Sequence, residues 1–289
     1  MQKFVTLLYK GGGLPGREAS IGDWHPPAVV QLNGSGNAER LARQPGRRGA
    51  LAAGGVSVVI PAKNEERSLP WVLGRMPDVV DEVILVDGES VDRTAELAQR
   101  VRPDIRIVRQ PGMGKGDALR AGFAAARGDF IVMIDADGSM DPAEIPACIA
   151  ELHDRRSGNG SGPYELVKGS RFLRGGGSDD LGRVRRAGNS LLLRLANALY
   201  GADFTDLCYG LIAFRRDQLD QLALESDGFE IETEIVVRGL KAGVRMGEVA
   251  SFERTRIDGA SNLRTWRDGA RVLATILKEW TRGGVRDAS

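Results

Sequence analysis

The sequence is poor in cysteine and histidine. Its 289 residues include two cysteines, Cys148 and Cys208, and two histidines, His25 and His153. Two cysteines in separate segments form neither a disulfide framework nor a zinc cluster, and they suit a reducing compartment. Two histidines leave little room for histidine-based catalysis, so a general base in this protein is expected to be a carboxylate.

An excess of one charge and a long apolar run are also absent. The formal net charge is +1, from 40 Lys and Arg against 39 Asp and Glu. This balance argues against nucleic-acid binding, which normally goes with a basic excess. No stretch approaches the roughly 18 apolar residues of a membrane span, and the N-terminal apolar run is too short for a signal peptide. We therefore predict a cytoplasmic protein, with peripheral contact at the inner face of the membrane as an open alternative.

The first 53 residues differ in composition from the rest of the chain. They are rich in Gly, Pro and Arg and have no sustained periodicity. Such a segment cannot bury enough apolar surface to offset the entropy lost on ordering. We therefore expect a flexible extension over 1–53, a folded domain over 54–264, and an amphipathic helix with a tail over 265–289.

Apolar runs alternate with helical patterns from Val56 onward. Runs at 56–62, 81–87, 105–110 and 129–134 predict strands, with helices between them. Strands that lack a polar face are typical of parallel sheets covered on both sides. The pattern predicts an α/β fold with a Rossmann-like, largely parallel central sheet and helices on both faces. In such folds ligands bind beyond the carboxyl ends of the strands.

Two aspartates, Asp135 and Asp137, follow the fourth apolar run with one residue between them. Carboxylates in this arrangement can converge on Mg²⁺ or Mn²⁺, whose shell is then completed by water and substrate phosphates. The same letters also describe an ordinary turn, because Asp, Gly and Ser often end strands. Glu65, Asp87 and Glu89 follow the first and second strands and come to the same edge. This repetition favours a ligand cleft over a series of unrelated turns.

Four segments in order carry a resemblance to a known family. They are "VSVVIPAKNEE", "VILVDGESVDRT", "GKGDALRAGFAAARGDFIVMIDADGSMDP" and "VKGSRF". In order and spacing they resemble family 2 glycosyltransferases of the GT-A fold, and the likeness is greatest to dolichyl- or polyprenyl-phosphate sugar synthases. The resemblance covers roughly residues 56–265. It implies inverting transfer of a hexose from GDP- or UDP-hexose to dolichyl or polyprenyl phosphate, with Mg²⁺ or Mn²⁺ as cofactor.

The resemblance also implies roles for individual residues, which fall into three groups. The donor-binding residues are Pro61, Glu65, Asp87, Lys115, Asp135, Arg256 and Ser261. The metal ligands are Asp135, Asp137 and Ser139. The residues implied in catalysis are Asp137, Arg171, Arg185 and Asp206, the two arginines facing phosphates.

The chain departs from the family pattern at three places. Lys63 stands where the family usually has an aromatic residue, and Gly88 replaces the second acid of "VDDxS". Both lie near the expected base pocket, so they leave the nucleotide open. "DLCYGL" at 206–211 differs from the "DPxSGF" of many synthases, which leaves the acceptor open.

The choice of acceptor depends on a general base. A hydroxyl acceptor normally needs one, whereas a phosphate is already anionic. The candidate carboxylates are Asp206, Glu232 and Glu234, and the scarcity of histidine favours a lipid phosphate acceptor. Three alternatives stay open: a glycosyltransferase acting on a soluble hydroxyl acceptor in secondary metabolism, a sugar nucleotidyltransferase, and a non-catalytic module that binds a nucleotide sugar. The oligomeric state, a homo-oligomer included, is open as well.

Two further segments bear on the acceptor side. The Gly-rich residues 173–186 are expected to form a mobile loop over the cleft. In the segment 265–280, five apolar residues recur at helical intervals with basic residues between them: Trp266, Leu273, Ile276, Leu277 and Trp280. Such a helix either lies in a lipid interface or packs on its own domain. We expect packing.

Overall fold

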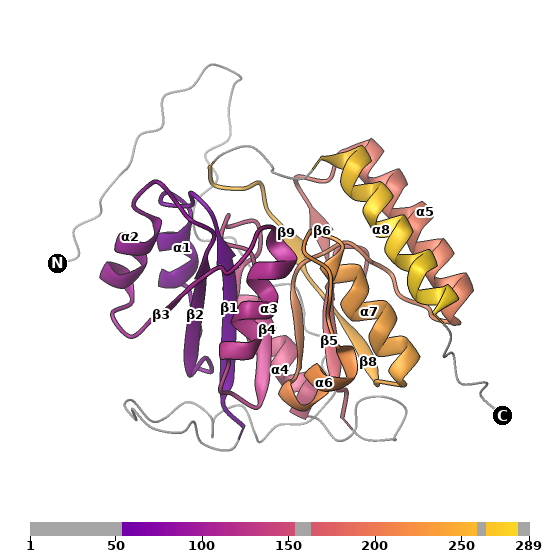
Figure 1. Ribbon diagram of the computed structural model, residues 1–289, viewed down its shortest axis with the longest axis horizontal. Coiled ribbons are helices and arrows are strands. Elements are labelled where there is room, and N and C mark those ends of the chain that lie inside the picture. The colour runs from indigo at the N-terminus through magenta and orange to yellow at the C-terminus, as the bar shows by residue number, and fades with distance from the viewer. Residues whose placement is uncertain (1–53, 154–162, 259–263, 283–289) are drawn as a thin grey trace. The chain divides into compact units, whose positions relative to one another are not determined.

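A seven-stranded sheet forms the centre of the computed structural model, which describes residues 54–153, 163–258 and 264–282 (Figure 1). The strand order is β3-β2-β1-β4-β7-β5-β8. β7 is antiparallel to β4 and β5, and the other neighbouring pairs are parallel. The predicted α/β fold with a largely parallel sheet is confirmed.

The elements have the following bounds. The strands of the large sheet are β1 Val56–Ala62, β2 Glu82–Asp87, β3 Arg106–Arg109, β4 Phe130–Met133, β5 Leu166–Ser170, β7 Ile212–Arg215 and β8 Met246–Ala250. A second, two-stranded sheet contains β6 Gly177–Ser178 and β9 Phe252–Glu253. The α-helices are α1 Leu69–Gly74, α2 Thr94–Val101, α3 Lys115–Ala125, α4 Ile145–His153, α5 Arg183–Tyr200, α6 Leu219–Leu222, α7 Ile231–Ala242 and α8 Thr265–Thr281. The 3₁₀ helices are η2 Pro142–Glu144 and η3 Arg216–Gln218.

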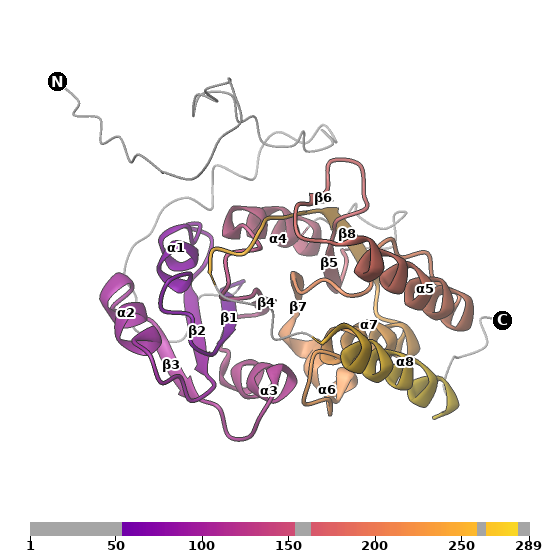
Figure 2. The same ribbon diagram turned by 90° about the horizontal axis from the view of Figure 1, so that it is seen from above.

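Helices cover both faces of the sheet because alternate strand residues point to opposite sides. Val58 and Val132 belong to the cluster that includes side chains of α1 and α4. Val59 and Ile131 belong to the cluster on the other face, with side chains of α3 and α7. Figure 2 shows α1 and α4 on one side of the sheet and α3 and α6 on the other. Burial on both faces explains why the strands read as continuous apolar runs.

The strand order reverses at β1. The chain runs from β1 outward to β2 and β3, whereas β4 lies on the other side of β1. In open α/β sheets such a switch point leaves a crevice at the carboxyl ends of the two strands. Asp135 and Asp137 directly follow β4, so the fold places them at this crevice.

Two segments differ from the sequence-based expectation. A mobile loop was expected over 173–186, but α5 begins at Arg183, so Arg185 lies in a helical turn and not in a loop. Arginine and alanine both favour helix, which explains the earlier start. The Gly-rich segment before α5 contains β6, which pairs with β9. The expected extension 1–53 and Ser261 lie outside the described residues.

The predicted C-terminal helix is present as α8, next to α5 and α7. These three helices share an apolar cluster that includes Ala196, Val237 and Ile276. Within the described part of the chain, no helix combines the length and the apolar character that crossing a bilayer requires.

We predict that Gly122→Ala lowers the free energy of unfolding by about 1–3 kcal/mol through overpacking. The new methyl carbon would lie 2.3 Å from Cγ1 of Val59 and 2.9 Å from Cγ2 of Val86, because α3 packs closely on β1 and β2. Gly188→Ala on α5 is the matched control, since nothing lies within 4 Å of that position. Alanine favours helix over glycine, so the control should gain up to about 1 kcal/mol. Urea denaturation measures both, and equal stabilities would contradict the close approach of α3.

Candidate active site

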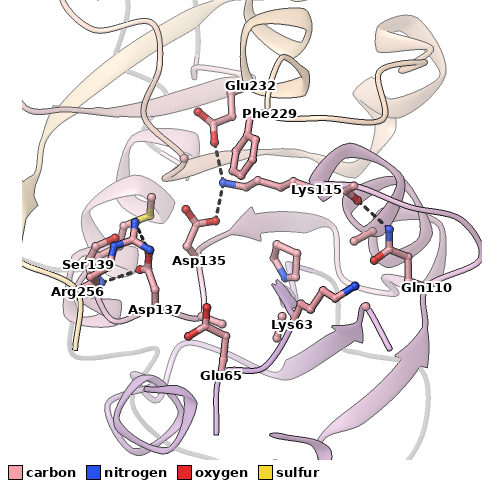
Figure 3. A pocket seen from close by; sticks show the side chains of 18 of the residues that line it. Lys63, Glu65, Gln110, Lys115, Asp135, Asp137, Ser139, Phe229, Glu232 and Arg256 are labelled. Atoms are coloured by element: carbon pink, nitrogen blue, oxygen red, sulfur yellow. Dashed lines mark hydrogen bonds and ion pairs between the residues drawn. The ribbon is translucent and has the colours of Figure 1, made fainter. Parts of the chain in front are cut away.

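A pocket opens at the carboxyl ends of β1 and β4, with a cavity volume of about 350 Å³. This size is in the range of small-molecule sites. Figure 3 shows side chains from several elements that point into it. Eight of the residues implied by the sequence line it: Pro61, Glu65, Lys115, Asp135, Asp137, Ser139, Arg185 and Arg256.

Lys115 holds Asp135 and Glu232 together. Its Nζ lies 2.6 Å from Oδ1 of Asp135 and 2.7 Å from Oε1 of Glu232 (Figure 3). Burial alone would lower the pKa of Lys115, but the two carboxylates outweigh it and the pKa lies above its ordinary value. The lysine is therefore a permanent cation at the first turn of α3, and it joins β4 to α7.

Asp137 is held by the loop that follows it and by a distant arginine. Its Oδ1 accepts a hydrogen bond of 2.9 Å from the N–H of Ser139, and its Oδ2 lies 3.2 Å from Nη2 of Arg256. The N–H of Ile257 donates to the carbonyl of Asp137 at 3.0 Å. Gly138 has φ +76°, and a Cβ there would lie 2.5 Å from Cδ1 of Ile257. The chain after β9 thus lies along this loop and brings Arg256 to the aspartate.

Negative charge is concentrated in this part of the pocket. Burial raises the pKa of Asp135 to about 6, with repulsion from Asp137 and Glu232 adding to the effect and Lys115 opposing it. The pKa of Glu65 is also raised, first by burial; a hydrogen bond with Ser68 opposes this, and repulsion from Asp137 adds to it. Mutual repulsion of this kind is relieved by a cation.

The acidic side chains fit a divalent cation that is only partly held by protein. Asp135 and Asp137 offer carboxylate oxygens at one strand end, and Ser139 offers a hydroxyl beside them. Among the described residues, no three His, Cys, Asp or Glu side chains converge as a complete metal site. Mg²⁺ is commonly bound by one or two carboxylates, with water and substrate phosphates completing the shell. The donor set therefore suits a metal that arrives with a phosphate ligand.

The family model of glycosyl transferase family 2 matches residues 57–222. This chain belongs to that family. It is accordingly a glycosyltransferase, and the resemblance read from its sequence is confirmed.

Relatives and solved structures agree with this assignment. The chain is 31% identical over 231 residues to glycosyltransferase AglJ of Haloferax volcanii, covering 77% of this chain and 71% of that protein. It is 30% identical to the dolichyl-phosphate hexose transferase of the same organism, covering 77% and 92% of the two chains. Glucosyl-3-phosphoglycerate synthase of Mycobacterium tuberculosis, crystallised with Mn²⁺, UDP and phosphoglyceric acid, is similar with a TM-score of 0.61. That match has 26% identity and covers 81% of this chain and 80% of the neighbour.

One end of the glycosyltransferase pocket is formed by Lys63, Gly88 and Gln110. A Cβ on Gly88 would lie 2.8 Å from Oε1 of Gln110, so the glutamine occupies the space that an acidic side chain at 88 would need. Asp87 itself lies outside the lining, and its buried Oδ1 has no hydrogen-bond partner. Buried polar atoms in native proteins are normally paired. The unpaired oxygen of Asp87 is an exception to this rule, and the structure does not bring it to the pocket.

Arg171 and Asp206 lie outside the pocket, contrary to the roles implied for them. Nε and Nη2 of Arg171 donate to the two carboxylate oxygens of Asp206 at 2.7 and 3.0 Å. Its Nη1 donates to Glu253 at 3.0 Å, and its guanidinium lies 4.9 Å from the ring centroid of Tyr209. The arginine is 5% exposed and the aspartate 0%. The two charges are paired inside the protein, and neither side chain lines the pocket.

The three candidate bases all carry an ion pair. Asp206 pairs with Arg171, Glu232 with Lys115, and Glu234 with Arg238 at 3.1 Å. Of the three, only Glu232 lines the pocket.

Sequence reasoning missed parts of this site that depend on distant contacts. Glu232 was considered only as a base, whereas its contact with Lys115 links residues 117 positions apart. Gln110 and Phe229 line the pocket, and no motif in the sequence singled them out. Nζ of Lys115 lies 5.7 Å from the ring centroid of Phe229, which adds an aromatic contact to the lysine.

Arg171→Met is expected to lower the free energy of unfolding by about 3–5 kcal/mol, because it leaves two buried carboxylates without a cation. Arg185→Met is the matched control. Its ion pair with Asp180, at 3.2 Å, is about one-quarter exposed, so its loss should cost about 1 kcal/mol or less. Guanidinium denaturation compares the two variants. A stable Arg171→Met protein would argue against a structural role for this arginine.

Proposed function

We propose that this glycosyltransferase is metal-dependent and moves a hexose, with inversion, from a nucleoside-diphosphate hexose to the phosphate of a polyprenyl or dolichyl phosphate. One observation carries the proposal. Asp135 and Asp137 lie with Lys115, Arg185 and Arg256 in one pocket, whereas the candidate bases are held in ion pairs. The pocket therefore suits two phosphate-bearing substrates, and each of the three candidate bases would have to give up an ion pair before it could serve a hydroxyl acceptor.

The donor would occupy the part of the pocket between Asp135 and Asp137 and the end formed by Lys63, Gly88 and Gln110. Asp135, Asp137 and Ser139 are the residues that would hold Mg²⁺ or Mn²⁺. When bound, such an ion supplies Lewis-acid stabilisation of the leaving diphosphate. The Mn²⁺ and UDP in the mycobacterial structure support this assignment for the donor, and they leave the choice between UDP and GDP open for this chain.

Lys115 and Arg256 would serve the diphosphate as well as the aspartates. Both line the pocket and both are cations beside its carboxylates. Hydrogen bonds from ionised donors to phosphate oxygens are short and strong, and arginine can make two in parallel. In the proposed reaction these side chains orient the diphosphate and stabilise the charge that it gains.

The transfer itself needs no proton acceptor when the acceptor is a phosphate. A phosphate oxygen attacks the anomeric carbon of the hexose from the side opposite the leaving group. The bond between that carbon and the diphosphate oxygen breaks, and the nucleoside diphosphate leaves with the electron pair. The acceptor oxygen already carries negative charge, so the ion-paired state of Asp206, Glu232 and Glu234 is compatible with the reaction.

A small soluble acceptor is the second candidate, because the mycobacterial neighbour was crystallised with phosphoglyceric acid. A hydroxyl acceptor would require a base in the pocket. Glu232 is the candidate base that lines it, and it would first have to give up its 2.7 Å contact with Lys115. This requirement places the soluble acceptor second.

Asp137→Asn is expected to lower metal-dependent transfer by about 100-fold or more. A neutral amide holds a divalent cation less well than a carboxylate does, so the charge on the leaving diphosphate is less stabilised. The fold should be unchanged by circular dichroism. The wild type should be stabilised against heat by its true donor together with metal, by mass action, and the variant should not. A panel of GDP- and UDP-hexoses identifies that donor. Asp104→Asn, at an exposed surface position, is the control, and full activity of Asp137→Asn would remove the metal assignment.

Arg185→Ala is expected to reduce transfer to a prenyl phosphate by about tenfold or more, since a charge-assisted contact to a phosphate is lost. Nucleotide binding should change by about twofold or less, because Arg185 enters the pocket from α5 and serves the acceptor side. Steady-state kinetics and nucleotide titration separate the two effects. Unchanged transfer would place the acceptor phosphate elsewhere.

A further inference from the structure

The helices α5 and α8 form a layer of their own beside the sheet domain. Figures 1 and 2 both show them side by side, next to α7. Their inner faces share one apolar cluster, in which Ala196, Val272 and Ile276 are buried. Their remaining faces point away from this cluster.

The outward faces carry large apolar side chains. On α8 the expectation of packing is confirmed for Ile276 and wrong for the other four residues of the series: Trp266 is 84% exposed, Leu273 38%, Leu277 42% and Trp280 50%. These four are spaced by seven, four and three residues, which places them on one stripe of the helix. On α5, Val184 and Leu191 are exposed and seven residues apart. We call these six residues the apolar stripe.

The solvent-facing charges of both helices have one sign. α5 contains four arginines and no acidic residue. On α8, Asp268 and Glu279 are buried, whereas Arg267, Arg271 and Lys278 are exposed. The whole chain has a net charge of only +1, so the positive charge of these two helices is a local feature and not a consequence of composition. One exposed acid from outside them, Glu225, lies 3.5 Å from Lys278.

We propose that α5 and α8 dock this protein on the surface of an anionic lipid bilayer. Tryptophan and leucine on one stripe of a basic helix suit the boundary between headgroups and acyl chains. Exposed arginine and lysine are attracted to anionic lipids near the membrane surface. The proposal rests on the proposed function in one respect: a prenyl phosphate acceptor is carried by such a bilayer.

The docking surface leads to the catalytic pocket. Arg264, Arg267 and Arg271 line a cavity of about 210 Å³ together with Gly114, Lys115 and Phe229, and these last three residues also line the catalytic pocket. Arg185, in the first turns of α5, lines the catalytic pocket itself. The N-terminal ends of both helices therefore present arginines where a phosphate headgroup would pass from the bilayer to the aspartates.

A second copy of the chain is a poorer occupant of this surface. A two-fold interface brings the same patch of each copy together. The solvent-facing charges of both helices are positive, so such an interface would oppose like charges, which is costly. A bilayer with anionic headgroups supplies the opposite charge.

Vesicle sedimentation tests the docking surface. The wild type should bind vesicles made of equal parts phosphatidylcholine and phosphatidylglycerol, and should bind pure phosphatidylcholine weakly. The triple substitution Leu273→Ser, Leu277→Ser and Trp280→Ser should weaken binding by about tenfold or more. Val91→Ser with Val101→Ser, two exposed apolar residues outside α5 and α8, is the matched control and should bind as the wild type does.

A charge variant gives a second, independent measurement. Arg194→Gln on α5 should bind the mixed vesicles roughly fivefold more weakly, and Arg100→Gln on α2 should not change binding. Added salt should weaken binding of the wild type, because it screens surface charges. Melting temperatures confirm that each variant is folded.

The outcomes separate docking from the proposed function. Transfer to a short, water-soluble prenyl phosphate should be unchanged in the triple variant, while transfer to a long-chain acceptor in vesicles should fall. Vesicle binding that is absent in the wild type, or equal in wild type and triple variant, overturns the docking surface. A wild-type dimer that becomes a monomer in the triple variant, without vesicle binding, assigns the stripe to a second copy and also overturns it. If the wild type binds vesicles as expected but no prenyl phosphate accepts the hexose, docking stands and the proposed acceptor is wrong.

Discussion

The pairing of two neighbouring aspartates with two cations is the interaction on which this site depends. Asp135 and Asp137 follow one strand, and carboxylates this close repel each other in a partly buried place. Lys115 and Arg256 supply the opposite charge. Each cation also fixes an element: Lys115 ties the start of α3 to α7 through Glu232, and Arg256 ties the chain after β9 to the loop after β4.

The sheet gives this interaction its position. The reversal of strand order at β1 opens a crevice beside β4, and the aspartates emerge there because β4 ends at Met133. The two apolar clusters on either face of the sheet hold β1 and β4 rigidly. The charged groups therefore stand on a packed support, which limits the reorganisation needed when a charged substrate binds.

The sequence was informative where a feature is local. Continuous apolar runs predicted β1, β2 and β4, because strands buried on both faces need mostly apolar residues. β3 was also predicted, although it is a partly exposed edge strand that begins and ends with arginine. The spacing of Asp135 and Asp137 at the end of such a run, together with the ordered family segments, pointed to the pocket. The positions of Pro61, Glu65 and Lys115 in the lining agree with that resemblance.

Contacts between residues far apart in the sequence could not be predicted from local patterns. Arg171 matched a phosphate-facing arginine of the family, but its place is set by Asp206 and by Glu253, which is 82 residues further along the chain. Helical periodicity placed Trp266 and Trp280 on one stripe, but it does not say whether a neighbouring helix covers that stripe. The Gly-rich loop was expected to extend to residue 186, but α5 begins at Arg183. Arg185 therefore lies in a helix and not in a loop.

The central proposal is that the pocket joins a hexose to a phosphate oxygen with inversion. The phosphate acceptor is favoured because each of the three candidate bases is held in an ion pair. The most direct test is the structure of the product made from an α-linked nucleoside-diphosphate hexose, Mg²⁺ or Mn²⁺ and a prenyl phosphate. Nuclear magnetic resonance of the purified product reports both the linkage and the anomeric configuration. The account predicts a β-linked hexose on the prenyl phosphate oxygen. A hexose on a hydroxyl oxygen, or one that keeps the α configuration, would contradict it.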